Sequence, residues 1–238
     1  MSTLSELQSK KLGLLELISI GFDLYLKNFR LFLGLYCIVL PFSTLIILFS
    51  SLGASLSNSI VTILFFFFYL FFLIVILPSY TAAISIIIEG LVLGERPQLQ
   101  LVIRRILSSI LPLTGLNMRF GINYLLRFLL LIVPGIIYLI NNGYYATAFI
   151  LRDQRGKAAF EYSKTLVKGN WWRVFFFYLI IGLTNFGLLR IFEKILNNVI
   201  VNSPILVAVL SNALTGLVGL GVGVSGVLIF LNLEFQTK

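Results

Sequence analysis

The sequence predicts an all-helical integral membrane protein, a bundle of six transmembrane helices with about three amphipathic helices on the cytoplasmic surface. The 238 residues are 59% hydrophobic and 11% charged, with a mean hydropathy of +1.02, which is too apolar for one water-soluble core. Several apolar runs reach the roughly 18 residues that a helix needs to cross the hydrocarbon core. Runs such as 63–77 do not alternate as barrel strands do. A single membrane domain, 1–238, is expected.

Residues 12–30 are expected to form an amphipathic helix that lies on the membrane surface. Side chains repeat at spacings of three and four, with apolar and polar stripes on opposite faces. The apolar stripe is Leu15, Ile18, Phe22, Leu26 and Phe29, and the polar stripe is Glu16, Ser19, Asp23, Lys27 and Arg30. No signal-peptide pattern precedes this segment, so insertion is expected to begin with the first span.

The first two spans are expected at 31–50 and 60–88. The loop between them, 51–59, carries no Lys or Arg, as an outer loop should. The second run is too long for the membrane as one straight helix, so a break or a strong tilt is expected near Pro78.

A second amphipathic helix is expected over 99–110, followed by the third span at 113–133. Pro134 and Gly135 indicate a tight turn. The fourth span is then expected to return at once, over 136–151.

The basic segment 152–173 lies between two apolar runs and has the pattern of a third amphipathic helix. The fifth span is expected at 171–191, opening with an aromatic pair that suits the head-group region. The sixth is expected at 205–231, where Gly219, Gly221, Gly223 and Ser225 allow a neighbouring helix to approach closely. That neighbour is either in the same chain or in the second copy of a homodimer.

The distribution of Lys and Arg predicts that both termini are cytoplasmic. Four of the 18 precede the first span, three lie in 89–112, six in 152–173 and one at the C-terminus, all on one side. Two lie on the other side, and two lie within the membrane. The net charge of +9 is therefore attributed to this bias and to contact with anionic lipids, and not to nucleic acid.

The sequence offers no visible catalytic or metal-binding constellation. It has no His, one Cys (Cys37), and nine carboxylates that all map to termini, surface helices or span ends. Acid–base catalysis and metal binding both need several such groups in one pocket. We therefore expect no enzyme activity, no cofactor and no metal.

Polar side chains on four spans are expected at a similar depth in the outer half of the membrane. They are Arg119, Asn123, Arg127, Asn141, Asn142, Asn185 and Asn212. An arginine within the hydrocarbon costs at least about 2.5 kcal/mol and should face the bundle interior. Two interpretations are open: hydrogen bonds that hold helices together, or an outward-open cavity for an anionic group around Arg127.

A second candidate site is the basic face of the third amphipathic helix together with its aromatic anchor. It comprises Lys157, Lys164, Lys168, Trp171, Trp172 and Arg173. Basic residues close to the cytoplasmic face attract anionic lipids. This face is expected to dock anionic lipid or an acidic partner.

Three stretches carry a resemblance to a known family: IGFDLYLKNFRLFLGL, VPGIIYLI and GKAAFEYSKTLVKGNWWRVF. They resemble bacterial six-span proteins of the glycerophosphoryl diester phosphodiesterase membrane-domain family and its uncharacterised relatives. The matching positions are Ala158, Ser163, Leu166, Lys168, Gly169 and Trp172. Asn141 and Asn142 stand where the family often has an Arg, and the soluble phosphodiesterase barrel of some members has no counterpart here.

The resemblance implies a multi-pass protein of the bacterial cytoplasmic membrane. Together with the residues it predicts a non-enzymatic module that binds lipid or a partner protein. The alternative is a transporter or lipid-handling protein with its cavity around Arg127.

Overall fold

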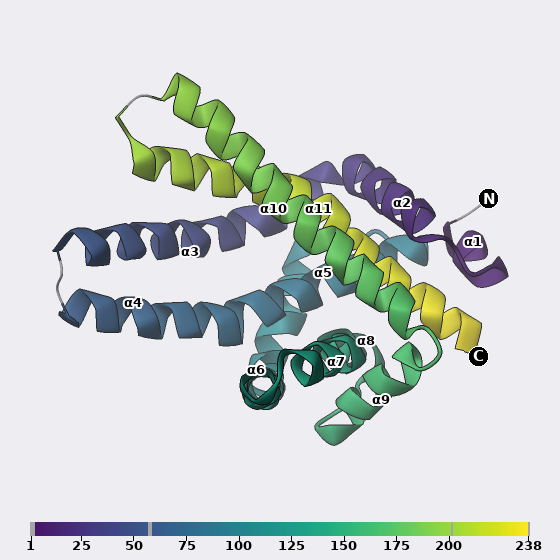
Figure 1. Cartoon of the computed structure of the whole chain (residues 1–238). Helices are drawn as coiled ribbons and strands as arrows, with labels where there is room; N and C mark the ends of the chain where they lie inside the picture. Colours follow the sequence, from purple (N-terminus) through teal and green to yellow (C-terminus); the bar gives the residue numbers. More distant parts are fainter. Residues whose placement is uncertain (1–2, 57–58, 201, 238) are drawn as a thin grey trace.

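The computed structural model describes residues 3–56, 59–200 and 202–237, which are helical almost throughout and contain no strand (Figure 1). The all-helical prediction is therefore confirmed for these ranges. Five helical segments within them are long and apolar enough to cross a membrane: Phe29–Ser51, Ile60–Val92, Leu99–Leu130, Trp171–Val199 and Pro204–Gln236. This is the arrangement of a multi-pass membrane protein.

The N-terminal segment forms two short helices, α1 (Thr3–Ser9) and α2 (Leu14–Lys27). The sequence predicted the second but not the first. The face of α2 that packs on the C-terminal helix carries Leu17, Gly21, Leu24 and Tyr25. Two members of the expected apolar stripe, Leu15 and Leu26, are instead 77% and 65% exposed. The helix thus has one apolar face on the protein and another directed outward.

Helices α3 (Phe29–Leu56) and α4 (Ser59–Phe71) form a long hairpin that projects from the body (Figure 1). The expected loop 51–59 is wrong in its extent, because α3 continues to Leu56; residues 57–58 lie outside the described ranges. The hydroxyls of Ser50 and Ser51 donate to the carbonyls of Ile47 and Leu48. This local bonding lets polar residues continue the helix.

A short π-helix, η1 (Phe72–Ile76), joins α4 to α5 (Leu77–Val92). The helix continues through Pro78, and one wide turn just before the proline stands where a break or a strong tilt was expected. Pro78 has no N–H to donate to the carbonyl of Ile74. The side-chain amide of Asn117 supplies the missing donor, at 3.1 Å from that oxygen and 3.0 Å from the carbonyl of Leu73.

Helix α6 (Leu99–Leu130) joins the expected amphipathic helix 99–110 and the expected third span in one continuous helix. The chain turns at Leu131, whose backbone is extended, and not at Pro134, which lies in the first turn of α7 (Ile132–Asn142). Proline is well tolerated there, because the first-turn N–H groups have no helical acceptor. Gly135 packs on Phe128, and a Cβ on it would lie 3.0 Å from the Phe128 Cα.

The fourth span expected at 136–151 is wrong as a single helix. The chain forms α7 and then α8 (Tyr145–Arg152), with Gly143 and Tyr144 between them. The hydroxyl of Ser163, on α9 (Lys157–Val167), donates to the carbonyl of Asn141 and accepts from the N–H of Tyr144. One fully buried serine thus satisfies backbone groups at the break, which makes the interruption tolerable.

The last two helices, α10 (Trp171–Val199) and α11 (Pro204–Thr237), lie side by side across the body (Figure 1). The former begins at the expected aromatic pair but extends eight residues beyond the expected end. The C-terminal half of α11 is the most buried element, with Leu228, Ile229 and Phe230 all at 0% exposure. The two ends of the chain meet, because the amide of Asn232 donates to the carbonyls of Leu7 and Lys10.

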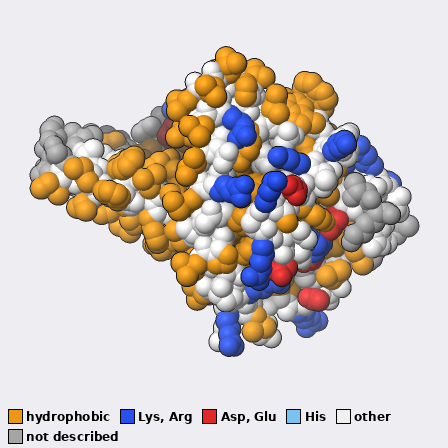
Figure 2. Space-filling view, turned by 90° about the horizontal axis from the view of Figure 1, so that it is seen from below, with side chains coloured by type: hydrophobic (Ala, Val, Ile, Leu, Met, Phe, Trp, Pro, Cys, Tyr) orange, Lys and Arg blue, Asp and Glu red, His pale blue; other side chains and the backbone are white. Residues whose placement is uncertain are grey.

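The surface divides into an apolar part and a charged part. Figure 2, seen from below, shows hydrophobic side chains over the projecting arm of α3 and α4, and charged side chains gathered on the body. The turn between α6 and α7 is also strongly apolar, with Leu129, Leu130 and Leu131 between 67% and 78% exposed. Exposed apolar surface of this extent suits contact with lipid.

Candidate functional site: a central cavity

A cavity of about 650 Å³ lies among the helices. Its walls come from α3, η1, α5, α6, the α7–α8 region, α10 and α11. Ligand sites in proteins have volumes of about 300–1,000 Å³ and often lie between the helices of bundles. The cavity is thus large enough for a small molecule or a lipid chain.

The lining of the cavity is aromatic and uncharged. None of the side chains on its walls is an Asp, Glu, Lys or Arg. Its aromatic members come from five parts of the fold: Tyr36, Tyr80, Phe120, Tyr144, Tyr145, Phe177 and Tyr178. Hydroxyl and amide groups supply the remaining polarity, which is typical of sites for apolar molecules.

Several of these polar groups already bond to the protein. The hydroxyl of Tyr145 donates to Asn117, the residue that also supports the π-helix. Tyr36 donates to the carbonyl of Ala213 at 2.9 Å, and the hydroxyls of Ser85 and Thr147 lie 3.3 Å apart. These bonds connect α3, α5, α6, α8 and α11 across the walls and hold the cavity's shape.

Glycines of α11 make room for the cavity and for the neighbouring helices. Gly223 lines the space, and a Cβ on it would have no neighbour within 4 Å. Gly221 instead lies against the ring of Phe22, and Ser225 against Gly21, both on α2. The small-residue surface expected on the sixth span is therefore occupied, at these positions, by helices of the same chain.

The structure only partly assembles the expected polar layer. Arg127 donates to the backbone and side-chain oxygens of Asn123 at 3.0 and 3.2 Å, and its guanidinium lies 4.2 Å from the ring centre of Tyr138. Arg119 lies 5.7 Å from the ring centre of Phe160. Arg127 thus bonds along α6 and stacks on a ring of α7, Arg119 lies over a ring of α9, and neither arginine lines the cavity.

The asparagines of that layer lie in different surroundings. Asn185 lines the cavity, and its amide donates to the carbonyl of Ile181. Asn142 is buried and donates to the carbonyl of Tyr138, while its side-chain oxygen has no partner. Asn141 contributes its carbonyl to Ser163, and Asn212 is half-buried on α11. Of the seven residues, Asn185 is the one on the cavity wall.

The candidate docking residues occupy two places. Lys157 and Lys164 are exposed on α9, where Lys157 pairs with Glu161 at 3.3 Å, and Lys168 is exposed just beyond it. Trp171, Trp172 and Arg173 open α10 and line a smaller pocket of about 390 Å³ together with Lys11, Gly169 and Asn170. This pocket has two cationic side chains and no carboxylate on its walls.

Arg173 also ties the start of α10 to the N-terminal region. One of its guanidinium nitrogens, Nη2, donates to the carbonyl of Leu12 and to the side chain of Asn232. The other, Nη1, is buried without a partner in the described ranges. Its main role is therefore to fix α10, α11 and the N-terminal segment together.

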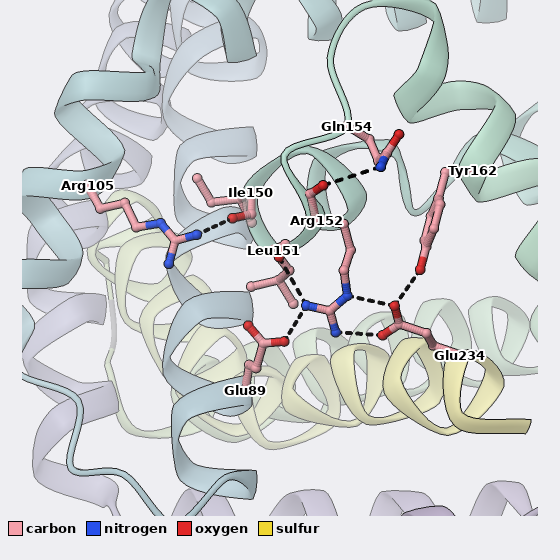
Figure 3. A network of polar contacts seen from close by, with 8 residues as sticks. All are labelled: Glu89, Arg105, Ile150, Leu151, Arg152, Gln154, Tyr162 and Glu234. Atoms are coloured by element: carbon pink, nitrogen blue, oxygen red, sulfur yellow. Dashed lines mark hydrogen bonds and ion pairs between the residues drawn. The ribbon is translucent and has the colours of Figure 1, made fainter. Parts of the chain in front are cut away.

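A partly buried ionic cluster around Arg152 was not predicted from the sequence. The guanidinium binds Glu234 through two nitrogens, at 2.6 and 2.5 Å, and Glu89 at 2.5 Å (Figure 3). Tyr162 donates a hydrogen bond to Glu234. The sequence places Glu89 and Glu234 at the ends of spans, and the structure brings both together around one arginine, with Glu234 2% exposed.

The cluster joins four elements: α5, the end of α8, α9 and the C-terminal part of α11. The two carboxylates come from positions far apart in the chain, so their spacing in the sequence does not indicate this cluster. The feature of the sequence that could have indicated it is the position of Arg152 at the end of an apolar run.

Replacing Tyr162 with phenylalanine should destabilise the protein by about 1.5 kcal/mol at pH 7, because the charged side chain of Glu234 loses a hydrogen bond. Burial, and then the bond to Glu234, raise the pKa of Tyr162 from 10.0 to about 12. The stabilisation that Tyr162 provides is therefore complete below pH 10.0 and is lost as the pH rises through about 12. The free energy of unfolding of the parent protein and of the variant, measured from pH 7 to 12, tests this prediction. A difference between the two that stays constant over this range would contradict the role given to Tyr162.

Compared with protein-family models, curated proteins and solved structures, the chain matches none of them.

Proposed function

We propose that this protein is a non-enzymatic, multi-pass membrane protein whose function is to hold a lipid-like molecule between its helices. The observation that carries the proposal is the central cavity, about 650 Å³ of mainly apolar space in a protein that meets lipid on its outer surface. A lipid chain in this space would replace contacts that an empty cavity lacks.

The proposed topology has six crossings with both termini in the cytoplasm of a bacterium. Helices α7 and α8 together provide the fourth of these crossings, in two pieces. Their 11 and 8 helical residues amount to roughly 28 Å of helix at 1.5 Å per residue, close to the thickness of the hydrocarbon core. The contact between Asn232 and Leu7, which puts both ends of the chain on one side, supports this topology.

The cationic pocket at the start of α10 and the exposed lysines of α9 together form a cationic surface. This surface would bind anionic lipid head groups on the cytoplasmic side. An acidic partner protein is the alternative ligand for that surface. The resemblance to the glycerophosphoryl diester phosphodiesterase membrane-domain family supports the bacterial cytoplasmic membrane as its location.

The test is whether lipid stays with the purified protein and leaves when the cavity is filled. Gly223→Leu should reduce retained lipid about tenfold or more, because the new side chain grows into the cavity and overpacking costs about 1–3 kcal/mol. Native mass spectrometry of protein released from lipid nanodiscs measures the bound lipid.

The matched control is Gly182→Leu on α10, where a Cβ has no neighbour within 4 Å and the residue is exposed and not on the cavity wall. It should retain lipid as the parent protein does. Equal retention by the parent and by Gly223→Leu, or no retained lipid in the parent, would overturn the proposed function.

A further inference from the structure

The walls of the central cavity carry hydroxyl groups that no protein group uses. Tyr80 on α5 and Tyr178 on α10 both line it, and neither hydroxyl has a hydrogen-bond partner in the described part of the chain. The hydroxyl of Tyr144 is fully buried and has no partner among the described residues, whereas the hydroxyls of Tyr80 and Tyr178 are not among these fully buried atoms. Both are free to bond with a molecule in the cavity.

The absence of charged side chains from the described walls of the cavity indicates which class of molecule it can bind. The chain has 18 Lys and Arg and nine Asp and Glu, yet none of those that the structure describes lines this cavity. An isolated ion is costly to bury in apolar surroundings unless it is paired. The walls offer hydroxyls and amides, which bond well to neutral polar groups.

The aromatic lining by itself would also suit a lipophilic cation, since aromatic faces attract ammonium groups. No carboxylate is present on the walls to balance such a charge, and the net charge of the chain is +9. The electrostatic balance therefore disfavours both anions and cations.

We infer that the cavity takes an uncharged amphiphile, an apolar chain with a hydroxyl- or carbonyl-bearing end that hydrogen-bonds to Tyr80 or Tyr178. This inference rests on the proposed function and adds the chemical class of the ligand. The chain of the amphiphile lies against the aromatic rings and the glycines of α11, such as Gly223, where the space is open.

The test uses three photoreactive probes with the same 16-carbon chain and the same diazirine, ending in an alcohol, a carboxylate or a trimethylammonium group. The purified protein in nanodiscs is labelled at pH 8, and mass spectrometry locates the modified residues. The alcohol should label cavity residues such as Leu77 and Leu220 and should be displaced by unlabelled hexadecanol. The two charged probes should label these residues at least about tenfold less.

The second arm removes the two hydroxyls. Tyr80→Phe combined with Tyr178→Phe should weaken labelling by the alcohol about tenfold, since the hydrogen bond to its end is lost while the rings remain. Tyr69→Phe is the matched control, because Tyr69 is 39% exposed and is not on the cavity wall.

The outcomes separate this inference from the proposed function. Labelling of the cavity by a charged probe as strongly as by the alcohol, or unchanged labelling of the double variant, would overturn the inference and leave lipid binding in place. Absence of cavity labelling by every probe, together with no retained lipid, would overturn both.

Discussion

Replacing Arg152 with leucine should destabilise the folded protein by about 3 kcal/mol. The substitution leaves Glu89 and Glu234 without their shared cation, and removing one partner of a buried ionic pair costs about 3–5 kcal/mol. We expect the lower end of that range, because Arg152 retains 24% exposure. Thermal unfolding in detergent, followed by circular dichroism, measures the loss.

Arg155→Leu is the matched control, because its ion pair with Asp153 is exposed on both sides, at 72% and 78%. Exposed pairs contribute at most about 1 kcal/mol. Adding Glu89→Gln and Glu234→Gln to the Arg152→Leu variant should restore part of the stability, since neither position then carries the charge that Arg152 balanced. Equal losses for Arg152→Leu and Arg155→Leu would show that the cluster does not stabilise the fold.

Replacing Gly21 with leucine should destabilise the protein by about 3 kcal/mol and release α2 from α11. A Cβ at this position would overlap the hydroxyl of Ser225 and lie 3.1 and 3.2 Å from its backbone N and Cα. Backbone atoms cannot move aside as a flexible side chain can, so the cost lies at the upper end of the usual range for overpacking. Thermal unfolding and the rate of proteolysis within residues 10–28 report the two effects.

Gly115→Leu offers the same change where a Cβ has no neighbour within 4 Å. Its stability should equal or slightly exceed that of the parent, because leucine is a better helix former than glycine. If Gly21→Leu behaved like Gly115→Leu, the close contact between α2 and α11 would not exist in the membrane.

The helical class and most of the helix positions could be predicted from composition and periodicity. Sequence patterns predicted the position of a helix feature correctly where one residue acts on its own helix. Examples are the irregular turn before Pro78 and the start of α10 at Trp171. Such patterns failed at the expected fourth span, 136–151. The apolar run there is interrupted because a serine from α9 caps the break, and this contact joins positions 22 residues apart.

The candidate site was harder to predict, for a physical reason. Charged and amide groups at one depth were expected to form the site, yet the cavity wall is rich in tyrosines and glycines, which also occur throughout apolar helices. Arg127 was expected either to join hydrogen bonds within the polar layer or to face a cavity for an anionic group, and Asn123, one turn away, supplies its hydrogen bonds. The residues that define the cavity converge only through packing, which the sequence does not display.

The contacts between the first and last helices also bear on how the protein is made. Asn232 and Leu7 bond across 225 positions, and α2 rests on the glycines of α11. Synthesis at about 5–20 residues per second places roughly 10–45 s between the appearance of these two ends. During that interval the inner face of α2 has no partner helix. The nascent protein therefore completes its native packing only after its final helix has left the ribosome.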